Sequence, residues 1–115
     1  MYCISINYKQ LKTESREAFS MQEKEQEAFF IRIQKEVSID GVILLMTCNR
    51  CEIYAAGSKD TMSVIERIWL AQKPGKEELF YEHIMRYEKE NAIRHLYRVI
   101  CGLDSAVLGE VEIIH

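Results

Sequence analysis

Alternating and unbroken runs of apolar residues predict three β-strands in the first half of the chain. Between residues 2 and 7, tyrosine and isoleucine alternate with cysteine, serine and asparagine, a period-two pattern that indicates a half-buried strand. Residues 42–46 form an unbroken apolar run, which is typical of a central strand with both faces covered. Residues 51–56 predict a third strand, and residues 47–50 form a tight connection before it.

Apolar residues at helical spacing predict three amphipathic helices. The first runs over residues 20–37, the second starts near Asp60 and ends at 73–75, and the third runs over 89–101 with Gly102 as its stop. The apolar positions that define these helices are Phe29, Phe30, Ile33 and Val37, then Met62, Ile65, Ile68 and Trp69, and finally Ala92, Leu96, Val99 and Leu103.

The segment between the second and third helices fits two structures. Apolar and aromatic residues alternate over 79–87, which predicts a last strand, whereas 77–85 also fits a helix. With the strand, the order of elements is βαββαβ, the split-βαβ or ferredoxin-like arrangement of an α+β fold. We therefore expect one sheet with helices on one face, followed by an additional C-terminal helix.

Composition and charge narrow the class of protein. The 115 residues, 48% hydrophobic and 29% charged, fit one globular domain. The net charge of −3 predicts no broad basic face, so any contact with RNA must be local or helped by another domain. No stretch approaches the ~20 consecutive apolar residues of a membrane helix, and the first residues lack the layout of a secretory signal, so we expect a cytoplasmic location. The four cysteines are then expected to be free thiols.

The connection Thr47-Cys48-Asn49-Arg50 carries the most informative chemistry in the sequence. It lies where a buried strand ends, at a sheet edge where side chains can meet ligands. The guanidinium of Arg50 can lower the pKa of the Cys48 thiol, which favours the nucleophilic thiolate, and it can also bind a carboxylate through two hydrogen bonds. The alternative is that Cys48 is a small buried residue and Arg50 a solvated one, and these four residues alone do not separate the two interpretations.

The pair Cys48 and Cys51 also has the C-x-x-C spacing of redox couples and zinc half-sites. A redox pair favours the N-terminus of a helix, whereas Cys51 opens a strand-like segment. A zinc site needs a second pair, whereas Cys3 and Cys101 stand alone. We therefore predict no metal site and interpret Cys51 as a strand residue.

The third helix contributes a histidine and two arginines. His95 lies on the apolar side of the helix, where a histidine is more often a satisfied core residue than a catalyst. Arg94 and Arg98 are one turn apart and form a small basic spot, for which a solvated helix face is a simpler explanation than a contact with a tRNA phosphate. The following segment, 102–110, fits either a surface loop or one that lines a ligand.

Two motifs together resemble the glutamyl-tRNA reductase family. The pattern T-C-N-R-x-E occurs at residues 47–52, and the pattern H-L-x-R-V-x-x-G-L-D-S-x-V-L-G-E occurs at residues 95–110. Two patterns in the right order are far more specific than either alone, and weaker similarity extends over nearly the whole chain. The resemblance implies that residues 1–115 are the N-terminal catalytic domain of such an enzyme.

The family resemblance implies an activity and a set of site residues. The enzyme reduces glutamyl-tRNA to glutamate-1-semialdehyde with NADPH, the first step of five-carbon tetrapyrrole and heme biosynthesis. Cys48 would be the nucleophile that forms a thioester, and His95 would be a general acid or base near the reacting carbonyl. Arg50 would bind the glutamyl carboxylate. The other residues implied to line the pocket are Thr47, Asn49, Ser105, Glu110 and Glu112.

The resemblance also implies partners: glutamyl-tRNA, the aminomutase that uses glutamate-1-semialdehyde, and a second copy of the enzyme in a homodimer. No G-x-G-x-x-G loop occurs in the chain, so we expect NADPH to be bound by a domain that this chain lacks, together with the dimerisation domain. The isolated domain is then not expected to complete the reduction.

Several positions depart from the pattern of the family. Ser5 and Tyr8 replace a glycine and a histidine of an early G-I-N-H segment, and Val111, Glu112 and His115 alter the later G-E-P-Q-I-L-G segment. Glu112 replaces a glutamine and adds a negative charge near a pocket meant for a carboxylate. The alternative hypothesis is therefore a catalytically impaired module, derived from the reductase fold, that binds tRNA or protein.

Overall fold

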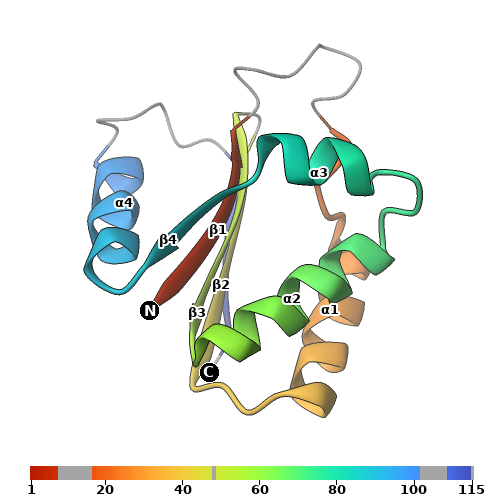
Figure 1. Cartoon of the computed structure of the whole chain (residues 1–115), viewed down its shortest axis with the longest axis horizontal. Helices are drawn as coiled ribbons and strands as arrows, with labels where there is room; N and C mark the ends of the chain where they lie inside the picture. The colour runs from red at the N-terminus through yellow and green to blue at the C-terminus, as the bar shows by residue number, and fades with distance from the viewer. Residues whose placement is uncertain (8–16, 48, 102–108, 115) are drawn as a thin grey trace.

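A single sheet lies between two layers of helices in the computed structural model, which describes residues 1–7, 17–47, 49–101 and, as a strand, 109–114. The elements in chain order are β1 (Tyr2–Asn7), α1 (Glu23–Glu36), β2 (Gly41–Thr47), β3 (Arg50–Ala56), α2 (Lys59–Ala71), α3 (Glu77–His83), β4 (Met85–Glu88), α4 (Glu90–Ile100) and β5 (Gly109–Ile114). Helices α1, α2 and α3 cover one face of the sheet, and α4 covers the other (Figure 1).

The sheet has the strand order β4-β1-β3-β2-β5, with every neighbouring pair antiparallel. Its first four strands have the order that the split-βαβ arrangement produces, so the predicted ferredoxin-like fold is confirmed. The apolar run at 42–46 lies inside the sheet, as predicted, because β2 pairs with β3 on one side and with β5 on the other. Strand β5 was not predicted.

The larger core lies between the sheet and helices α1, α2 and α3. Three aromatic rings pack edge to face at its centre, with ring centroids 5.5 to 6.2 Å apart: Phe19, Trp69 and Phe80. The indole nitrogen of Trp69 donates a hydrogen bond to the backbone oxygen of Phe19, which satisfies its one polar atom inside the core. The Ser58 side chain caps the first turn of α2 by accepting from the backbone of Thr61, so this helix begins close to the predicted Asp60.

The prediction of a half-buried first strand is wrong, because β1 is buried on both faces. The even-numbered residues Ile4 and Ile6 belong to the larger core, while Cys3 and Ser5 on the opposite face are only 1% and 2% exposed. Helix α4 covers this second face, where Cys3 and Tyr54 pack with Ala92. The structure therefore has the expected helices on one face of the sheet. The expected additional helix, α4, covers the other face.

The ambiguous segment contains both of the predicted structures in succession. Residues 77–83 form α3, and the predicted last strand is shortened to the four residues of β4. Phe80 determines this outcome, because its fully buried ring packs on Phe19 and Trp69 from a helical turn. Tyr81 and Met85, which the strand pattern places on one face of the predicted strand, are exposed.

The packing of α4 against the sheet leads to a test by substitution. Ala92 is fully buried against Cys3 and Tyr54, so the larger side chain of leucine does not fit at this position. Ala92→Leu should therefore lower the free energy of unfolding by about 1–3 kcal/mol. Ile93→Leu places the same side chain at the exposed neighbouring position and should change stability little. Urea denaturation measures both, and equal stability of the two variants would show that α4 does not pack as described.

Candidate active site

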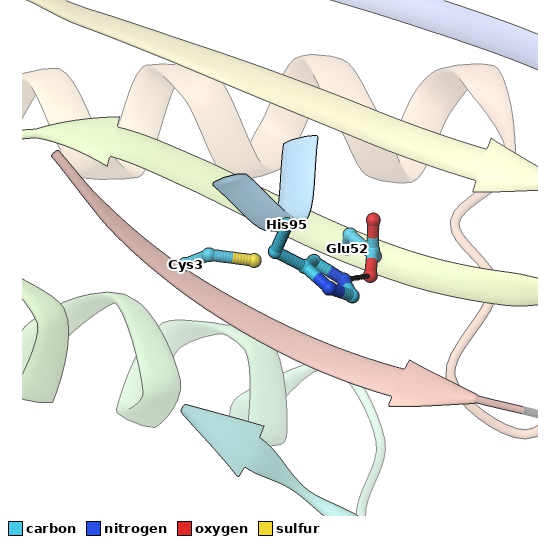
Figure 2. Close-up of side chains that lie close together, drawn as sticks. All are labelled: Cys3, Glu52 and His95. Atoms are coloured by element: carbon cyan, nitrogen blue, oxygen red, sulfur yellow. Dashed lines mark hydrogen bonds and ion pairs between the residues drawn. The ribbon is translucent and has the colours of Figure 1, made fainter. Parts of the chain in front are cut away.

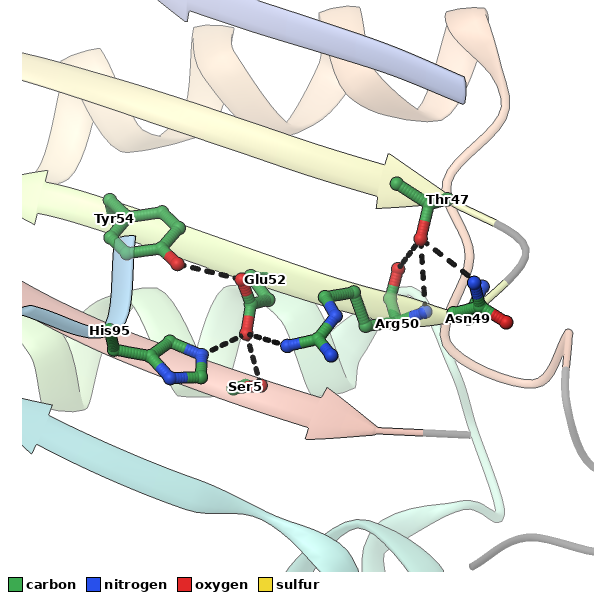
Figure 3. A network of polar contacts seen from close by, with 7 residues as sticks. All are labelled: Ser5, Thr47, Asn49, Arg50, Glu52, Tyr54 and His95. Atoms are coloured by element: carbon green, nitrogen blue, oxygen red, sulfur yellow. Dashed lines mark hydrogen bonds and ion pairs between the residues drawn. The ribbon is translucent and has the colours of Figure 1, made fainter. Parts of the chain in front are cut away.

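A buried glutamate, Glu52, is the centre of a polar network on the sheet face that α4 covers. Its side chain is 0% exposed and accepts hydrogen bonds from four residues on three elements (Figure 3). The donors are Ser5 Oγ at 2.6 Å, Tyr54 OH at 2.6 Å, His95 Nε2 at 2.5 Å and Arg50 Nη1 at 3.4 Å. The last contact is also an ion pair, with the Arg50 side chain 1% exposed.

Strand geometry and helix geometry bring these side chains together. Arg50, Glu52 and Tyr54 alternate along β3 and therefore face the same side of the sheet. The register of β1 with β3 places Ser5 opposite Glu52. His95 lies on the buried stripe of α4, one turn from Ala92 and from Val99, and so points at the sheet.

The hydrogen bonds keep Glu52 ionised in spite of its burial. Burial is the largest single effect and raises the pKa of Glu52, but the hydrogen bonds from His95, Ser5 and Tyr54 and the charge of His95 together lower it below the ordinary value. An ionised carboxylate can only accept hydrogen bonds, so His95 carries a proton on Nε2. Burial, followed by the nearby Cys3 and Glu52, raises the pKa of Tyr54 well above its ordinary value, so Tyr54 remains a donor.

Thr47 organises the turn between β2 and β3. Its hydroxyl oxygen accepts from the backbone nitrogens of Asn49 and Arg50, both at 3.1 Å, and donates to the backbone oxygen of Arg50 at 3.3 Å. These contacts fix the backbone from which the Arg50 side chain runs toward Glu52 (Figure 3). The predicted residues Thr47, Asn49 and Arg50 therefore lie together at one end of the network.

The second predicted catalytic residue, His95, has a defined environment. Its ring stacks on Tyr87 of β4, with centroids 4.1 Å apart and an interplanar angle of 11°. His95 and Arg50 both donate to the same oxygen of Glu52, Oε2. Two residues that the sequence suggested separately are thus joined through a third.

Three buried groups of the kind that bind metals also lie near one another. Cys3, Glu52 and His95 each offer a ligand atom, all within 4.8 Å of one another (Figure 2). Metal ligation requires a thiolate and an available carboxylate. Burial and then the charge of Glu52 raise the pKa of Cys3 well above its ordinary value, and Glu52 already accepts four hydrogen bonds. The cluster therefore fits a hydrogen-bonded network better than a metal centre.

The structure gives less information about the other predicted site residues. Cys48 and Ser105 lie outside the residues that the structure describes. Glu110 and Glu112 lie on β5, opposite Met46 and Leu44 in the register with β2. Their assignment to the substrate pocket stays a prediction.

Sequence reasoning assigned no role to Glu52, Ser5 or Tyr54. Glu52 belongs to the motif at residues 47–52, and a charged residue inside a strand of apolar neighbours is a signal that it needs buried partners. Ser5 stands where the family pattern has a glycine. The structure gives that serine a function, because its hydroxyl donates to Glu52.

The strand order and the buried network define an α+β domain of ferredoxin-like fold with a candidate active site between the sheet and α4. Residues 4–115 match the family model described as "Glutamyl-tRNAGlu reductase, N-terminal domain". The chain belongs to the glutamyl-tRNA reductase family and corresponds to its N-terminal domain, which confirms the resemblance seen in the sequence.

Individual relatives agree with this assignment. The chain is 38% identical to the glutamyl-tRNA reductase of Paenibacillus macerans over 96% of its length, and 39% identical to that of Priestia megaterium over 96%. The solved glutamyl-tRNA reductase of Methanopyrus kandleri matches 95% of the chain with a TM-score of 0.66 and 26% identity. The chain spans about a quarter of each relative: 26%, 25% and 24%. In the described part of the chain, every helix is too short or too polar to cross a bilayer.

The ionised state of Glu52 leads to a prediction about stability and pH. Glu52→Gln removes a buried charge on which four donors converge, and it should lower the free energy of unfolding at neutral pH by on the order of 3 kcal/mol. Because folding lowers the pKa of Glu52, its contribution is fully present above the unfolded value of about 4.3 and is lost as the pH falls through the folded pKa.

The difference in stability between the wild type and Glu52→Gln should therefore shrink as the pH falls below about 4. Urea denaturation between neutral and acid pH measures it. Glu78→Gln, on the exposed side of α3, is the control and should differ little from the wild type at any pH. A difference for Glu52→Gln that grows toward acid pH would mean that Glu52 is protonated in the folded protein.

Proposed function

We propose that this domain binds the glutamyl group of glutamyl-tRNA and accepts it on Cys48 as a thioester, within an enzyme that produces glutamate-1-semialdehyde. The observation that carries the proposal is the convergence of Arg50 and His95 on Glu52, beside the turn that contains position 48, in a chain of this family. The network supplies a cation and a histidine of fixed orientation at one end of the sheet.

The acyl transfer that we assign to Cys48 needs no reactant other than the domain and its substrate. The Cys48 thiolate attacks the carbonyl carbon of the glutamyl ester, a C–S bond forms, and the C–O bond to the terminal ribose breaks. The tRNA leaves as a free hydroxyl, which takes up one proton. Thiolate rather than thiol is the attacking species, so a nearby cation such as Arg50 favours the step.

His95 is the residue that we assign to proton transfer. With Nε2 donating to Glu52, Nδ1 is the ring atom left to accept the thiol proton and return it to the leaving hydroxyl. Glu52 orients the ring through this hydrogen bond, as a carboxylate does in other histidine-dependent acyl transfers. We assign to Arg50 the binding of the glutamyl carboxylate, with Thr47, Asn49, Ser105, Glu110 and Glu112 around the same pocket.

The remaining parts of the proposal concern the whole enzyme. NADPH, bound outside this chain, would supply the hydride that converts the thioester to an aldehyde and returns Cys48 to the thiol. We propose a homodimeric, cytoplasmic enzyme whose aldehyde product passes to an aminomutase. Within this chain, the residues only hold and activate the acyl group.

The thioester can be detected directly. Incubation of the chain with glutamyl-tRNA that carries a radiolabelled glutamyl group should give labelled protein, and Cys48→Ser should abolish the label because serine is far less nucleophilic at neutral pH. Cys101→Ser, which removes an exposed cysteine on the end of α4, should leave the label intact. Label that persists in Cys48→Ser would refute the assignment of the nucleophile.

One observation favours a second candidate, a binding module without chemistry. The Arg50 side chain is 1% exposed and directed at Glu52 rather than outward. A guanidinium used for the internal network would leave the substrate carboxylate without its proposed partner. The two candidates differ in the reactivity of Cys48.

A nucleophilic Cys48 should react with iodoacetamide at pH 7 about tenfold faster than a cysteine of ordinary pKa near 8.5, because a larger fraction is thiolate. Cys101, exposed directly after the last residue of α4, is the reference within the same molecule, and buried Cys3 and Cys51 should react slowly. Mass spectrometry of peptides follows each site. Equal rates at Cys48 and Cys101 would favour the binding module.

A further inference from the structure

A crevice between β4 and α4 opens beside the candidate active site. Its volume is about 550 Å³, within the range of small-ligand pockets. The stacked rings of Tyr87 and His95 line it, so the crevice and the Glu52 network share one histidine. The other lining residues are Arg86, Glu88, Asn91, Arg94 and Arg98.

In the part of the chain that the structure describes, two of the three arginines in this crevice form no ion pair. Arg86 is held by Glu66 through two hydrogen bonds of 2.8 Å, and Glu88 pairs with Lys59 at 3.4 Å. Among the residues that the structure describes, Arg94 and Arg98 make no ion pair, and both are exposed. In a chain of net charge −3, this wall of the crevice is a local positive site.

The two arginines are also arranged along the axis of α4. They lie one turn apart on α4, about 6 Å along the helix axis at 1.5 Å per residue. The helix ends at the same end of the sheet as the turn between β2 and β3 (Figure 1). Arg94 and Arg98 therefore form a short basic track that leads along the crevice toward the turn that contains position 48.

We propose that this crevice binds the phosphate backbone of the acceptor end of the tRNA, with Arg94 and Arg98 as the contacts. The inference rests on the proposed function, because a glutamyl ester at the turn is attached to an RNA strand that must leave the site in some direction. Guanidinium groups bind phosphate oxygens through paired hydrogen bonds, and phosphate contacts position a nucleic acid without reading its sequence. The track thus orients the strand so that its esterified end reaches Cys48.

A dinucleotide or inorganic phosphate presents the same chemistry as the RNA backbone. Two charges spaced along a helix axis fit successive phosphates of an extended strand, so we assign the crevice to RNA. The arginines then supply the local attraction that an acidic domain needs in order to hold a polyanion. Binding experiments distinguish RNA, a dinucleotide and inorganic phosphate.

The first experiment measures how binding of uncharged glutamate tRNA depends on salt. Each lost phosphate contact lowers the magnitude of the slope of log affinity against log salt by about 0.7 to 0.9. Arg94→Gln with Arg98→Gln should therefore bind more weakly and lose roughly 1.4 to 1.8 from the slope. Lys24→Gln with Lys35→Gln removes the same charge from exposed positions on α1, on the other face of the sheet, and should keep the wild-type slope.

An unchanged slope in the arginine variant, an equal loss in the lysine variant, or no measurable tRNA binding by the wild type at low salt would overturn the proposal. Binding of inorganic phosphate or NADPH that is lost in the arginine variant, together with an unchanged salt slope for tRNA, would instead assign the crevice to the smaller ligand.

The second experiment separates this proposal from the proposed function. Cys48 is acylated either from glutamyl-tRNA or from a small activated glutamyl ester without RNA. The arginine variant should react more slowly with glutamyl-tRNA below saturation and as fast as the wild type with the small ester. Equal slowing with both donors would contradict a role in RNA binding, whereas no acylation of the wild type by either donor would refute the thioester and leave the salt experiment to be judged separately.

Discussion

The burial of one carboxylate, Glu52, constrains the rest of this domain. A charge with no exposure to water inside a sheet is costly unless several donors compensate for it, and here they come from β1, β3 and α4. Helix α4 must therefore cover the second face of the sheet, and β1 must place a hydroxyl opposite β3. Fold and site are consequences of the same set of hydrogen bonds.

The two faces of the sheet carry different kinds of side chain. Under α1, α2 and α3, side chains are almost entirely apolar and supply most of the hydrophobic stabilisation. Under α4, strand β3 carries Arg50, Glu52 and Tyr54, which alternate with core residues and so stay out of the larger core. Separation of this kind allows a rigid polar site to be held by elements that a conventional core stabilises, which is what preorganised chemistry requires.

The sequence predicted the fold well because periodicity reports burial directly. The ferredoxin-like order, the interior position of residues 42–46 and three of the helices follow from it. It could not show that α4 covers the second face, so β1 appeared half-buried. It also could not separate α3 from β4, because residues 77–87 fit both periods until the partners of Phe80 are known. The motifs suggest roles for Arg50 and His95. They suggest none for Glu52, which belongs to the first motif, because only tertiary contacts show that the other two converge on one of its oxygens. β5 was missed although glutamate and apolar residues alternate over 110–113, because this alternation covers only four residues and follows a segment that fits a loop.

The central claim is that Glu52 is ionised in the folded domain and orders the side chains around it. Carbon-13 NMR of glutamate side-chain carboxyl groups, with the Glu52 signal assigned by its loss in a substituted variant, follows this ionisation directly as a function of pH. The account predicts that the Glu52 signal keeps its ionised position at pH values where exposed glutamates have begun to protonate, near 4.3. A Glu52 signal that shifts at or above that pH would show a neutral carboxyl group at the centre of the site and would contradict the account.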